Sequence, residues 1–573
     1  MRTQASADGL SVHAIAGTHV VLFGFDLPKE QTKDLIGFAL RRTDKSRPEA
    51  KPFYLDNFLL LKVNDKGKTP DHSSFLNPFQ EFVWGDYTLS PGTEYEYEVT
   101  ARYGEPGGLT SGASVTVAVE TEAETGDKQD VFFNRGVAGS QAYSRRFTPK
   151  GKRNPLPPDE AGPAAYEFLS RGLAEGMSSF IAQANGPEFG LRAAVYEFTC
   201  DAMLKAFADA EAAGADVKIV FDAVLNASKK TKKKKRNTPR DDNIAAIAAA
   251  GITPICKERT HTKIAHNKFI VLLEKGDPQA VWTGSTNFTE GALYGQWNVG
   301  HIVRDKDVAR RYLEFWQELE GDPLPAATTK WDDAETPLPD APTGIDLVFS
   351  PRADLAALDW YAKLMDKAEN SVFLTAAFGV TKELTAVFAE QKPYLRYLLL
   401  DKRQGDVTTI ARSPSNRITA GGYFGGKEGT PFANWMREAL TGLNTYVQYV
   451  HTKIMLIDPL GDDPIVITGS ANFSEASTTD NDENMLVIRG DTRLADIFLG
   501  EFMRLFTHFR FRGHTKTPST HPAPGPETPK TQLAPSTKAK GTLYLKDDDS
   551  WARGFYVTGS PREKERLLFR AQL

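Results

Sequence analysis

The sequence predicts a multidomain protein in which an N-terminal all-β sandwich is followed by two α/β halves related by a pseudo-twofold axis. Three observations lead to this prediction. The chain has 573 residues, which is too long for a single domain. Residues 8–122 consist of short β-rich runs separated by turns. Further on, a pattern of histidine, lysine, serine and asparagine occurs twice with identical internal distances. Matched spacing over so long a stretch implies two copies of one structural unit.

The N-terminal sandwich is expected over residues 1–124. Its strands are expected at residues 13–15, 18–25, 36–41, 58–63, 95–103 and 114–120. The run from Leu89 to Tyr95 contains a Ser-Pro-Gly turn and resembles the corner of a fibronectin type III domain, with Tyr95 as the corner tyrosine. A generic β-sandwich with a Pro-Gly turn is the alternative. Either domain would serve as a spacer or contact a protein partner, and neither is expected to be catalytic.

The first α/β half is expected over residues 130–330. Apolar residues at helical spacing predict helices at residues 163–184, 201–213, 241–250 and 308–319. Short apolar runs predict strands at residues 192–198 and 217–223. Because strands and helices alternate, we expect parallel βα units.

The second half, residues 343–513, repeats this order. Strands are expected at residues 371–378, 395–401 and 445–450, and helices at residues 432–440 and 493–507. Residues 514–541 are rich in Pro, Thr and Lys, which is typical of a disordered linker. The last segment, residues 542–573, is too small for a robust core of its own, so we expect it to dock onto the body of the protein or a partner subunit.

The repeated pattern supplies the candidate site. From each histidine, the lysine is 2 residues further on, the serine 19, the asparagine 21, and another amide or carboxylate 32. The first copy comprises His266, Lys268, Ser285, Asn287 and Asn298, and the second comprises His451, Lys453, Ser470, Asn472 and Glu483.

The residue types in these two copies suit an anion with several oxygens, and a phosphodiester is the obvious candidate. Two ammonium groups can neutralise its non-bridging oxygens, while Ser and Asn donate hydrogen bonds to charge that develops in the transition state. One imidazole can attack phosphorus and the other can protonate the leaving oxygen. No acidic cluster is placed to hold a metal, so we expect catalysis without a metal or cofactor.

His-x-Lys, four residues, Asp, then Gly-Ser-x-Asn, present twice, resembles the phospholipase D superfamily over about residues 130–513. The resemblance implies a metal-independent phosphodiesterase with a phosphohistidine intermediate. It implies that His266 is the nucleophile and that His451 is the general acid and then the base. It also implies that the residue 32 positions on orients the histidine of the other half, so that Glu483 supports His266 and Asn298 supports His451.

The two copies are not identical. Leu273 stands where the family pattern has Asp, and Asn298 where it often has Glu, whereas the second copy retains Asp458. The family Asp is generally a supporting residue, so its loss need not abolish catalysis; an inactive first half is the alternative. A further match to the short pattern, at residues 261–263, lacks a correctly spaced Gly-Ser-x-Asn, and we interpret it as the entry to a strand.

A dense basic loop points toward nucleic acid. It follows the strand expected at residues 217–223, and strand ends line the site in open α/β sheets. The loop contains Lys229, Lys230, Lys232, Lys233, Lys234, Lys235 and Arg236. Such a loop can hold a polyanionic backbone by charge, and further basic residues at Arg145, Arg146, Lys402 and Arg403 add to it. A solvated loop without function and a membrane-surface contact are the alternatives.

We therefore favour a nuclease that cleaves DNA or RNA, with endonuclease and exonuclease action both left open by the sequence. The alternatives are a phospholipase D that hydrolyses or transfers phosphatidyl groups, and an inactive protein that binds nucleic acid or a partner. The net charge of −5 gives no global sign of a polyanionic partner. Two cysteines in apolar surroundings and the lack of a signal peptide or membrane-spanning stretch favour the cytoplasm. The missing span also disfavours the cardiolipin-synthase branch of the superfamily. The sequence leaves the oligomeric state open.

Overall fold

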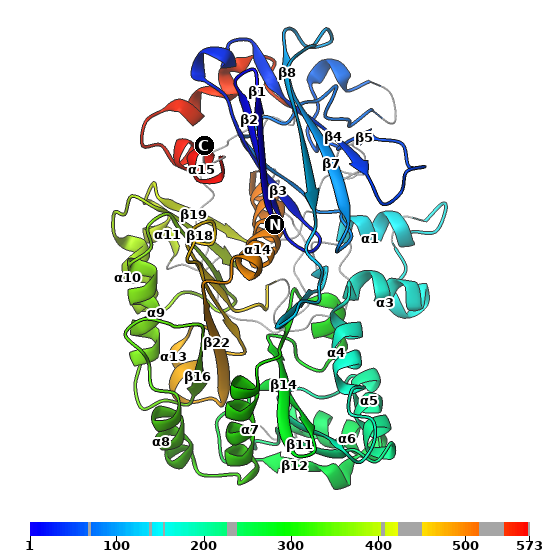
Figure 1. Cartoon of the computed structure of the whole chain (residues 1–573), viewed down its shortest axis with the longest axis vertical. Helices are drawn as coiled ribbons and strands as arrows, with labels where there is room; N and C mark the ends of the chain where they lie inside the picture. Colours follow the sequence, from blue (N-terminus) through cyan, green and yellow to red (C-terminus); the bar gives the residue numbers. More distant parts are fainter. Residues whose placement is uncertain are drawn as a thin grey trace, which may run out of the picture.

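The computed structural model describes residues 1–66, 70–136, 140–152, 155–225, 238–402, 407–421, 450–514 and 544–570. Sheets from the start of the chain lie at one end of the molecule together with the C-terminal segment (Figure 1). Two sheets flanked by helices lie side by side at the other end, one from each α/β half (Figure 1). The chain is therefore multidomain, with a sheet-rich N-terminal region and two α/β halves.

The N-terminal region contains two four-stranded antiparallel sheets. The first has the order β1 (Arg2–Ala7), β2 (Leu10–Ala16), β3 (Val21–Asp26) and β6 (Val83–Asp86). The second has the order β5 (Phe53–Tyr54), β4 (Leu35–Asp44), β7 (Glu94–Tyr103) and β8 (Thr110–Glu120). Phe23 of the first sheet and Phe38 of the second belong to one buried cluster, so the two sheets share a core. The Tyr95 hydroxyl accepts a hydrogen bond from Ser90 N at 3.1 Å. Assignment to the fibronectin type III family stays a prediction.

One strand expected in this region is wrong. Residues 58–63 form no strand; Leu60 makes a single bridge with Tyr544, and the 3₁₀ helix η2 (Lys62–Asn64) follows. The cause is local, because a buried asparagine supplies the hydrogen bonds that a neighbouring strand would otherwise provide. Asn77 Oδ1 accepts from Leu61 N at 2.9 Å, which satisfies the backbone without a ladder.

The first half is built on a seven-stranded mixed sheet. Its order is β12 (Cys256–Arg259), β11 (Asp216–Asp222), β10 (Phe189–Val195), β13 (Lys268–Glu274), β14 (Asp277–Gly284), β15 (Val299–Val303) and β9 (Gln129–Phe133). The strands β10, β11 and β12 are parallel and the remaining pairs are antiparallel, so the expectation of parallel units holds for only part of the sheet. Lys275 and Gly276, with φ of +53° and +85°, connect β13 to β14. A two-residue turn of this kind requires antiparallel neighbours.

The second half repeats this topology strand for strand. Its order is β19 (Asn416–Ala420), β18 (Leu395–Leu400), β17 (Ser371–Ala376), β20 (Ile454–Ile457), β21 (Ile465–Gly469), β22 (Glu483–Arg489) and β16 (Ile345–Ser350). Again the strands β17, β18 and β19 are parallel and the others antiparallel. The expected helix at residues 432–440 lies outside the described residues, as does the expected strand at 445–450 except for Val450.

Helices cover both sheets. They are α1 (Ser140–Phe147), α2 (Pro158–Ala161), α3 (Pro163–Ser170), α4 (Leu173–Ile181), α5 (Asp201–Ala212), α6 (Arg240–Ala249), α7 (Lys306–Glu320), α8 (Pro325–Glu335), α9 (Ala356–Asp366), α10 (Lys382–Ala389), α11 (Val407–Ile410), α13 (Glu475–Thr479), α14 (Thr492–His514) and α15 (Pro561–Phe569). The helix expected at residues 163–184 is two helices, α3 and α4. Arg171 and Gly172 separate them in left-handed conformations, with φ of +48° and +89°. The short segments are the 3₁₀ helices η1 (Lys29–Thr32), η4 (Thr253–Ile255), η6 (Asp549–Trp551) and η7 (Arg553–Tyr556) and the π-helix η5 (Gly291–Gly295).

One hydrophobic core joins the halves. It contains Phe269 of β13, Phe373 of β17 and Phe498 of α14, all buried. Helix α14 runs between the two halves and the N-terminal sheets (Figure 1). Within this helix Glu501 forms a buried ion pair with Arg171 of the first half at 2.7 Å. The halves are therefore fixed against each other, and residues at their contact keep defined positions.

The C-terminal segment docks onto the body of its own chain. Trp551 enters the N-terminal core and its Nε1 donates to Leu35 O at 2.9 Å. Glu565 of α15 accepts from Tyr397 OH of the second half at 3.1 Å. The segment thus connects the N-terminal sheets to the second half, while the expected linker at 514–541 lies outside the described residues apart from His514. None of the described helices combines the length and apolar character needed to cross a bilayer.

Candidate active site

The two copies of the repeated pattern meet where the halves contact each other. His266 lies just before β13, and its backbone N donates to Asp482 O of the second half at 3.0 Å. His451 lies before β20, and its backbone N donates to Trp297 O of the first half at 3.2 Å. The backbone N of each histidine is therefore hydrogen-bonded to the residue directly before Glu483 or Asn298. These two residues each lie 32 positions after the histidine of their own half, and each contacts the histidine of the other half.

Each histidine side chain likewise contacts a side chain of the other half. His266 Nδ1 lies 2.8 Å from Glu483 Oε2, and His451 Nδ1 lies 2.9 Å from Asn298 Oδ1. All four side chains are buried, the histidines at 8% and 6% exposure and their partners at 0%. The contacts between halves that the resemblance implies are thus present, and the catalytic roles remain predictions.

Hydrogen bonds around Asn298 fix the tautomer of His451. Asn298 Nδ2 donates to Ala292 O at 3.0 Å, so its Oδ1 must face His451 as an acceptor. His451 Nδ1 consequently carries the proton, and it also lies 3.1 Å from Ser285 O, a second acceptor. The Glu483 carboxylate imposes the same tautomer on His266. Both rings therefore leave Nε2 for chemistry.

The serines of the pattern contact Glu483 and Asn298. Ser470 Oγ donates to Glu483 Oε2 at 2.7 Å, and Ser285 Oγ donates to Asn298 Oδ1 at 2.8 Å. Both are fully buried. The serines therefore hold the residues that contact the histidines, and the expectation that they donate to charge developing in the transition state stays a prediction.

The two lysines carry positive charge into this buried space. Lys268 Nζ donates to His266 O at 2.6 Å and Lys453 Nζ donates to His451 O at 2.5 Å. Burial lowers the pKa of Lys268 to about 8 and that of Lys453 well below its usual range, where the positive charge of Lys268 adds to the effect. An ammonium has three donors, so each lysine retains N–H groups for an anion.

Burial and the neighbouring charges shift the pKa of both histidines and of Glu483. Burial lowers the pKa of His266 to about 4, against the attraction of Glu483. Burial also lowers the pKa of His451 well below 6.5, and the charges of Lys453 and Lys268 lower it further. Burial raises the pKa of Glu483, but His266 and Lys268 more than offset this and keep it ionised. Cations of each half thus act on the other, and the combined site favours an anionic ligand.

Two aspartates that the sequence analysis missed hold the backbone before each histidine. Asp222 Oδ2, at the end of β11, accepts from Ala265 N at 2.8 Å. Asp401 Oδ1, after β18, accepts from Val450 N at 2.9 Å. Both are 2% exposed and occupy corresponding positions in the two sheets. An aspartate ending the second parallel strand of each half was the signal that could have identified them.

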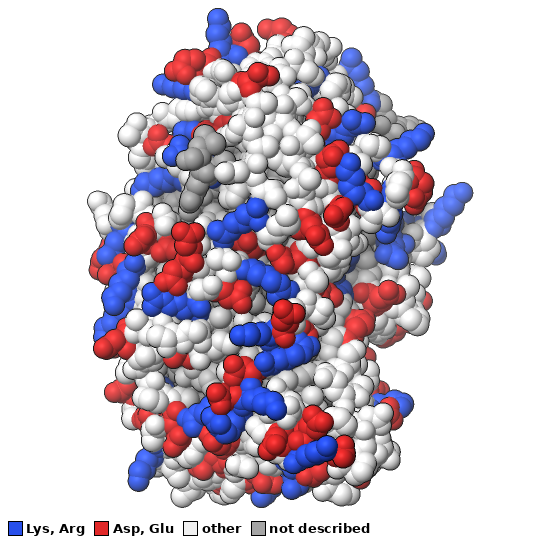
Figure 2. Space-filling view, viewed as in Figure 1, with Lys and Arg blue, Asp and Glu red and all other residues white. Residues whose placement is uncertain are grey.

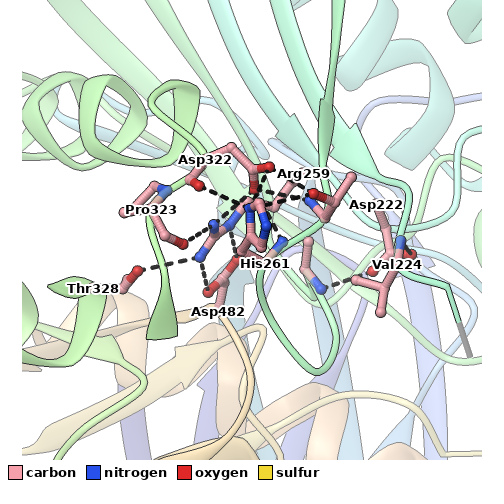
Figure 3. Close-up of polar contacts among 10 residues, drawn as sticks. Asp222, Val224, Arg259, His261, Asp322, Pro323, Thr328 and Asp482 are labelled. Carbon is pink, nitrogen blue, oxygen red and sulfur yellow. Dashed lines mark hydrogen bonds and ion pairs between the residues drawn. The ribbon is translucent and has the colours of Figure 1, made fainter. Parts of the chain in front are cut away.

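Residues of the segment that precedes His266 form polar contacts with other parts of the chain, and those of Arg259 and His261 can be followed in Figure 3. Arg259 bridges the halves, since its Nε contacts Asp482 Oδ2 at 2.9 Å and its Nη1 contacts Asp322 Oδ1 at 2.9 Å. His261 Nδ1 lies 2.9 Å from Asp322 Oδ2, and Lys263 pairs with Asp480. The extra short match at residues 261–263 therefore belongs to the approach to β13, as interpreted, and its charges are paired outside the buried cluster.

The remaining predicted residues divide into three groups. Asn287 Nδ2 donates to Glu197 Oε2 at 2.6 Å, while Asn472 Oδ1 is buried without a hydrogen-bond partner in the described part of the chain. Asp458 lies away from the histidines and accepts from the backbone N of residues 369, 370 and 371 at 2.8, 2.6 and 2.8 Å. The basic loop lies outside the described residues, as do residues 403–406 and 422–449.

Across the described ranges no three metal-binding side chains gather into a site, and metal independence stays a prediction.

Residues 179–319 and 385–506 match the family model "Cardiolipin synthase, PLD-like domain". These two segments are therefore similar to a phospholipase D-like domain, and they include every histidine, lysine, serine and asparagine of the repeated pattern. The model is named for cardiolipin synthase, the branch that the sequence analysis disfavoured, and its name alone assigns no substrate to this chain. No curated protein matches the chain.

Several solved structures resemble the chain. Polyphosphate kinase from Porphyromonas gingivalis has 13% identity and a TM-score of 0.38, over 59% of this chain and 48% of the kinase, so the chain spans about half of its length. Nuc from Salmonella typhimurium, a phospholipase D family member, has 27% identity and a TM-score of 0.21, over 26% and 86%. Phosphatidylserine synthase from Haemophilus influenzae has 11% identity and a TM-score of 0.39, over 59% and 85%. Likenesses of this size decide neither substrate nor mechanism.

Proposed function

We propose that this protein is a phosphodiesterase that needs no metal and acts through a phosphohistidine intermediate, with one active site shared by two pseudo-twofold-related halves. The observation that supports this most directly is the exchange of partners, in which Glu483 orients His266 and Asn298 orients His451. Because each histidine is oriented by a residue of the other half, we assign a single reaction to the two copies together.

In the first step the Nε2 lone pair of His266 attacks phosphorus, and the bond from phosphorus to the leaving oxygen breaks. His451 Nε2–H gives its proton to that oxygen. His451 must therefore be protonated when substrate binds. Burial and nearby lysines lower its pKa in the free site, and the negative charge of a bound phosphodiester reverses that effect.

In the second step His451, now neutral, takes a proton from water while the water oxygen attacks phosphorus. The phosphorus–nitrogen bond breaks, a phosphomonoester leaves, and both histidines return to their starting states. Glu483 is suited to the nucleophile side because a carboxylate stabilises the imidazolium that forms on attack. Asn298 is suited to the acid side because a neutral amide does not hold a proton on His451 as strongly.

We assign the two lysines and Asn472 to binding of the phosphate group. Lys268 and Lys453 would neutralise its non-bridging oxygens in the buried space, where such interactions are stronger than in water. Asn472 would donate from its amide to the same oxygens. The proposal needs no metal for these tasks, and activity in EDTA tests that point.

For the substrate we favour DNA or RNA. The sequence of the basic loop, Lys229 to Arg236, supports this choice by charge. On the face drawn in Figure 2, Lys and Arg are intermingled with Asp and Glu and form no continuous basic track. The preference for nucleic acid therefore rests mainly on the charge of the loop. Phosphatidyl hydrolysis or transfer is the second candidate, favoured by the family model's name. The N-terminal region is proposed as a fibronectin type III-like module that contacts a protein partner.

The test is a trapping experiment on the full chain in EDTA. Radiolabelled DNA, RNA and phosphatidylcholine are offered in parallel, and acid-labile phosphorus bound to protein is measured after rapid quenching. We expect label from a nucleic acid in the wild type and none in His266→Ala. Label from lipid alone would overturn the choice of substrate, and no label from any of the three would support the binding-only alternative.

A further inference from the structure

We infer that Phe378 forms a stacking subsite for the nucleobase of the leaving nucleotide, on the His451 side of the active site. This inference rests on the proposed nuclease function and specifies which part of the substrate the second half recognises.

Strand register gives the positions that correspond between the halves. Ala193 of β10 pairs with Ile270 of β13, and Leu374 of β17 pairs with Met455 of β20. Ile270 and Met455 each lie four residues after a pattern histidine, so they correspond to each other. Four residues beyond Ala193 and Leu374, the chain reaches Glu197 and Phe378. The same strand end thus carries a carboxylate in one half and an aromatic ring in the other.

In the first half this strand end is occupied by paired groups. The Tyr196 ring lies with its centroid 4.9 Å from that of His266, and Lys268 Nζ lies 5.3 Å from the Tyr196 ring centroid. Glu197 accepts from Asn287 Nδ2 at 2.6 Å. The wall beside the nucleophilic histidine is therefore filled by protein groups that contact each other and the pattern residues.

In the second half, Ala377 and Phe378 take the positions that correspond to Tyr196 and Glu197. Ala377 stands where Tyr196 stands and has no ring to cover His451. Phe378 is 59% exposed, although every residue of β17 just before it is buried. Among the described residues Asn472 has no carboxylate partner like the one that holds Asn287, because Phe378 takes the position of Glu197. An exposed ring and an available amide therefore lie on one side of the site.

The chemistry places the leaving group on that side. His451 gives its proton to the leaving oxygen, so the leaving nucleotide must lie next to His451. A nucleobase stacks on an exposed aromatic ring without regard to sequence, since every base has a π-face. Phe378 would therefore bind the leaving nucleotide and discriminate little among the four bases.

The experiment compares two short oligonucleotides, identical except that one has a normal base in the leaving nucleotide and the other is abasic there. In Phe378→Ala we expect KM for the base-containing substrate to rise about tenfold and kinetics with the abasic substrate to stay unchanged. Phe378→Trp should restore the wild-type value. Phe53→Ala is the matched control, because Phe53 is also exposed, at 49%, and lies on the N-terminal sheets.

Equal effects of Phe378→Ala on both substrates, or no effect on either, would overturn the subsite while leaving the nuclease function in place. Failure of the wild-type chain to cleave either oligonucleotide would overturn the nuclease function and the subsite together. Thermal unfolding of the three variants serves as the check on folding, and we expect all of them to match the wild type because the altered rings are exposed.

Discussion

The two α/β halves share every strand and their order, yet they differ at the positions around the site. The first half has a tyrosine beside His266, which contacts a carboxylate, whereas His451 contacts an amide and the second half has the exposed Phe378 at the corresponding strand end. The difference shows that a duplicated scaffold was kept while the chemistry of each copy diverged. Because each histidine depends on a residue from the other half, neither half is complete alone.

The largest expected effect separates the two histidines. His266→Ala should reduce phosphodiester cleavage by about 10⁴-fold, since it removes the nucleophile. His451→Ala should reduce it by about 10³-fold on a nucleotide leaving group. On a p-nitrophenyl ester the leaving oxygen needs no proton, so only His451→Ala should recover the first step, although it still lacks the base of the second. The burst of p-nitrophenol release in the first turnover checks this, and equal losses of the burst rate in the two variants would refute the division of roles.

The second effect concerns the orienting residues. Glu483→Gln should lower kcat by about 100-fold, because an amide stabilises the His266 imidazolium less than a carboxylate does. Asn298→Asp should raise the pKa of His451 and move the alkaline limb of the pH–rate profile, where activity falls as His451 loses its proton, to higher pH. The pH dependence of kcat for both variants is the measurement. A profile unchanged in Asn298→Asp would separate Asn298 from His451.

The third effect concerns the two aspartates that hold the backbone. Asp222→Ala and Asp401→Ala each leave a buried N–H without an acceptor, at a cost of about 1–3 kcal/mol. We expect kcat to fall about tenfold with little change in KM. Asn at either position retains an acceptor oxygen and should restore kcat. Asp222→Ala should slow formation of the phosphohistidine, whereas Asp401→Ala should slow cleavage mainly for leaving groups that need a proton.

The fourth effect is on stability against pH. The pKa of His266 is about 4 in the folded chain and 6.5 ordinarily, so between these values the unfolded chain binds more protons. Stability should therefore rise as pH increases from 4 to 6.5 and be lost as pH falls through that window. Denaturant unfolding across the window measures it. Vanadate, as a phosphate-like anion, should flatten the dependence, and His266→Asn should reduce it.

The smallest effect on activity is expected at Asp458, where the second half retains a residue that the first half has lost. Its carboxylate accepts three backbone hydrogen bonds away from the histidines. Asp458→Ala should cost about 1–2 kcal/mol of stability and leave kcat within about twofold of the wild type. Chemical denaturation and initial rates check this. A large loss of kcat at unchanged stability would place Asp458 in the catalytic machinery.

The repeat could be predicted from the sequence because equal spacing in two copies indicates equivalent structural units. The 21 residues from histidine to asparagine span a hairpin in each half, β13–β14 and β20–β21, although the strands of the second hairpin are shorter and the segment that joins them is longer. Periodicity likewise located α5, α6 and α7 to within two residues of their observed ends. The strand expected at residues 58–63 failed because the competing partner, Asn77, comes from a loop with no periodic signal.

The sequence by itself determined that two copies exist, which residues each contains and where they have diverged. Only the tertiary structure decided how they are used. His266 and Glu483 are 217 residues apart, and their 2.8 Å contact exists because α14 and the shared core fix one half against the other. Within each half, the packing of neighbouring strands turns Ser285 toward Asn298 and Ser470 toward Glu483, and Phe378 is exposed at the position where Glu197 is paired. Local patterns encode strands and turns, but which side chains meet depends on the packing of surfaces that are distant in the chain.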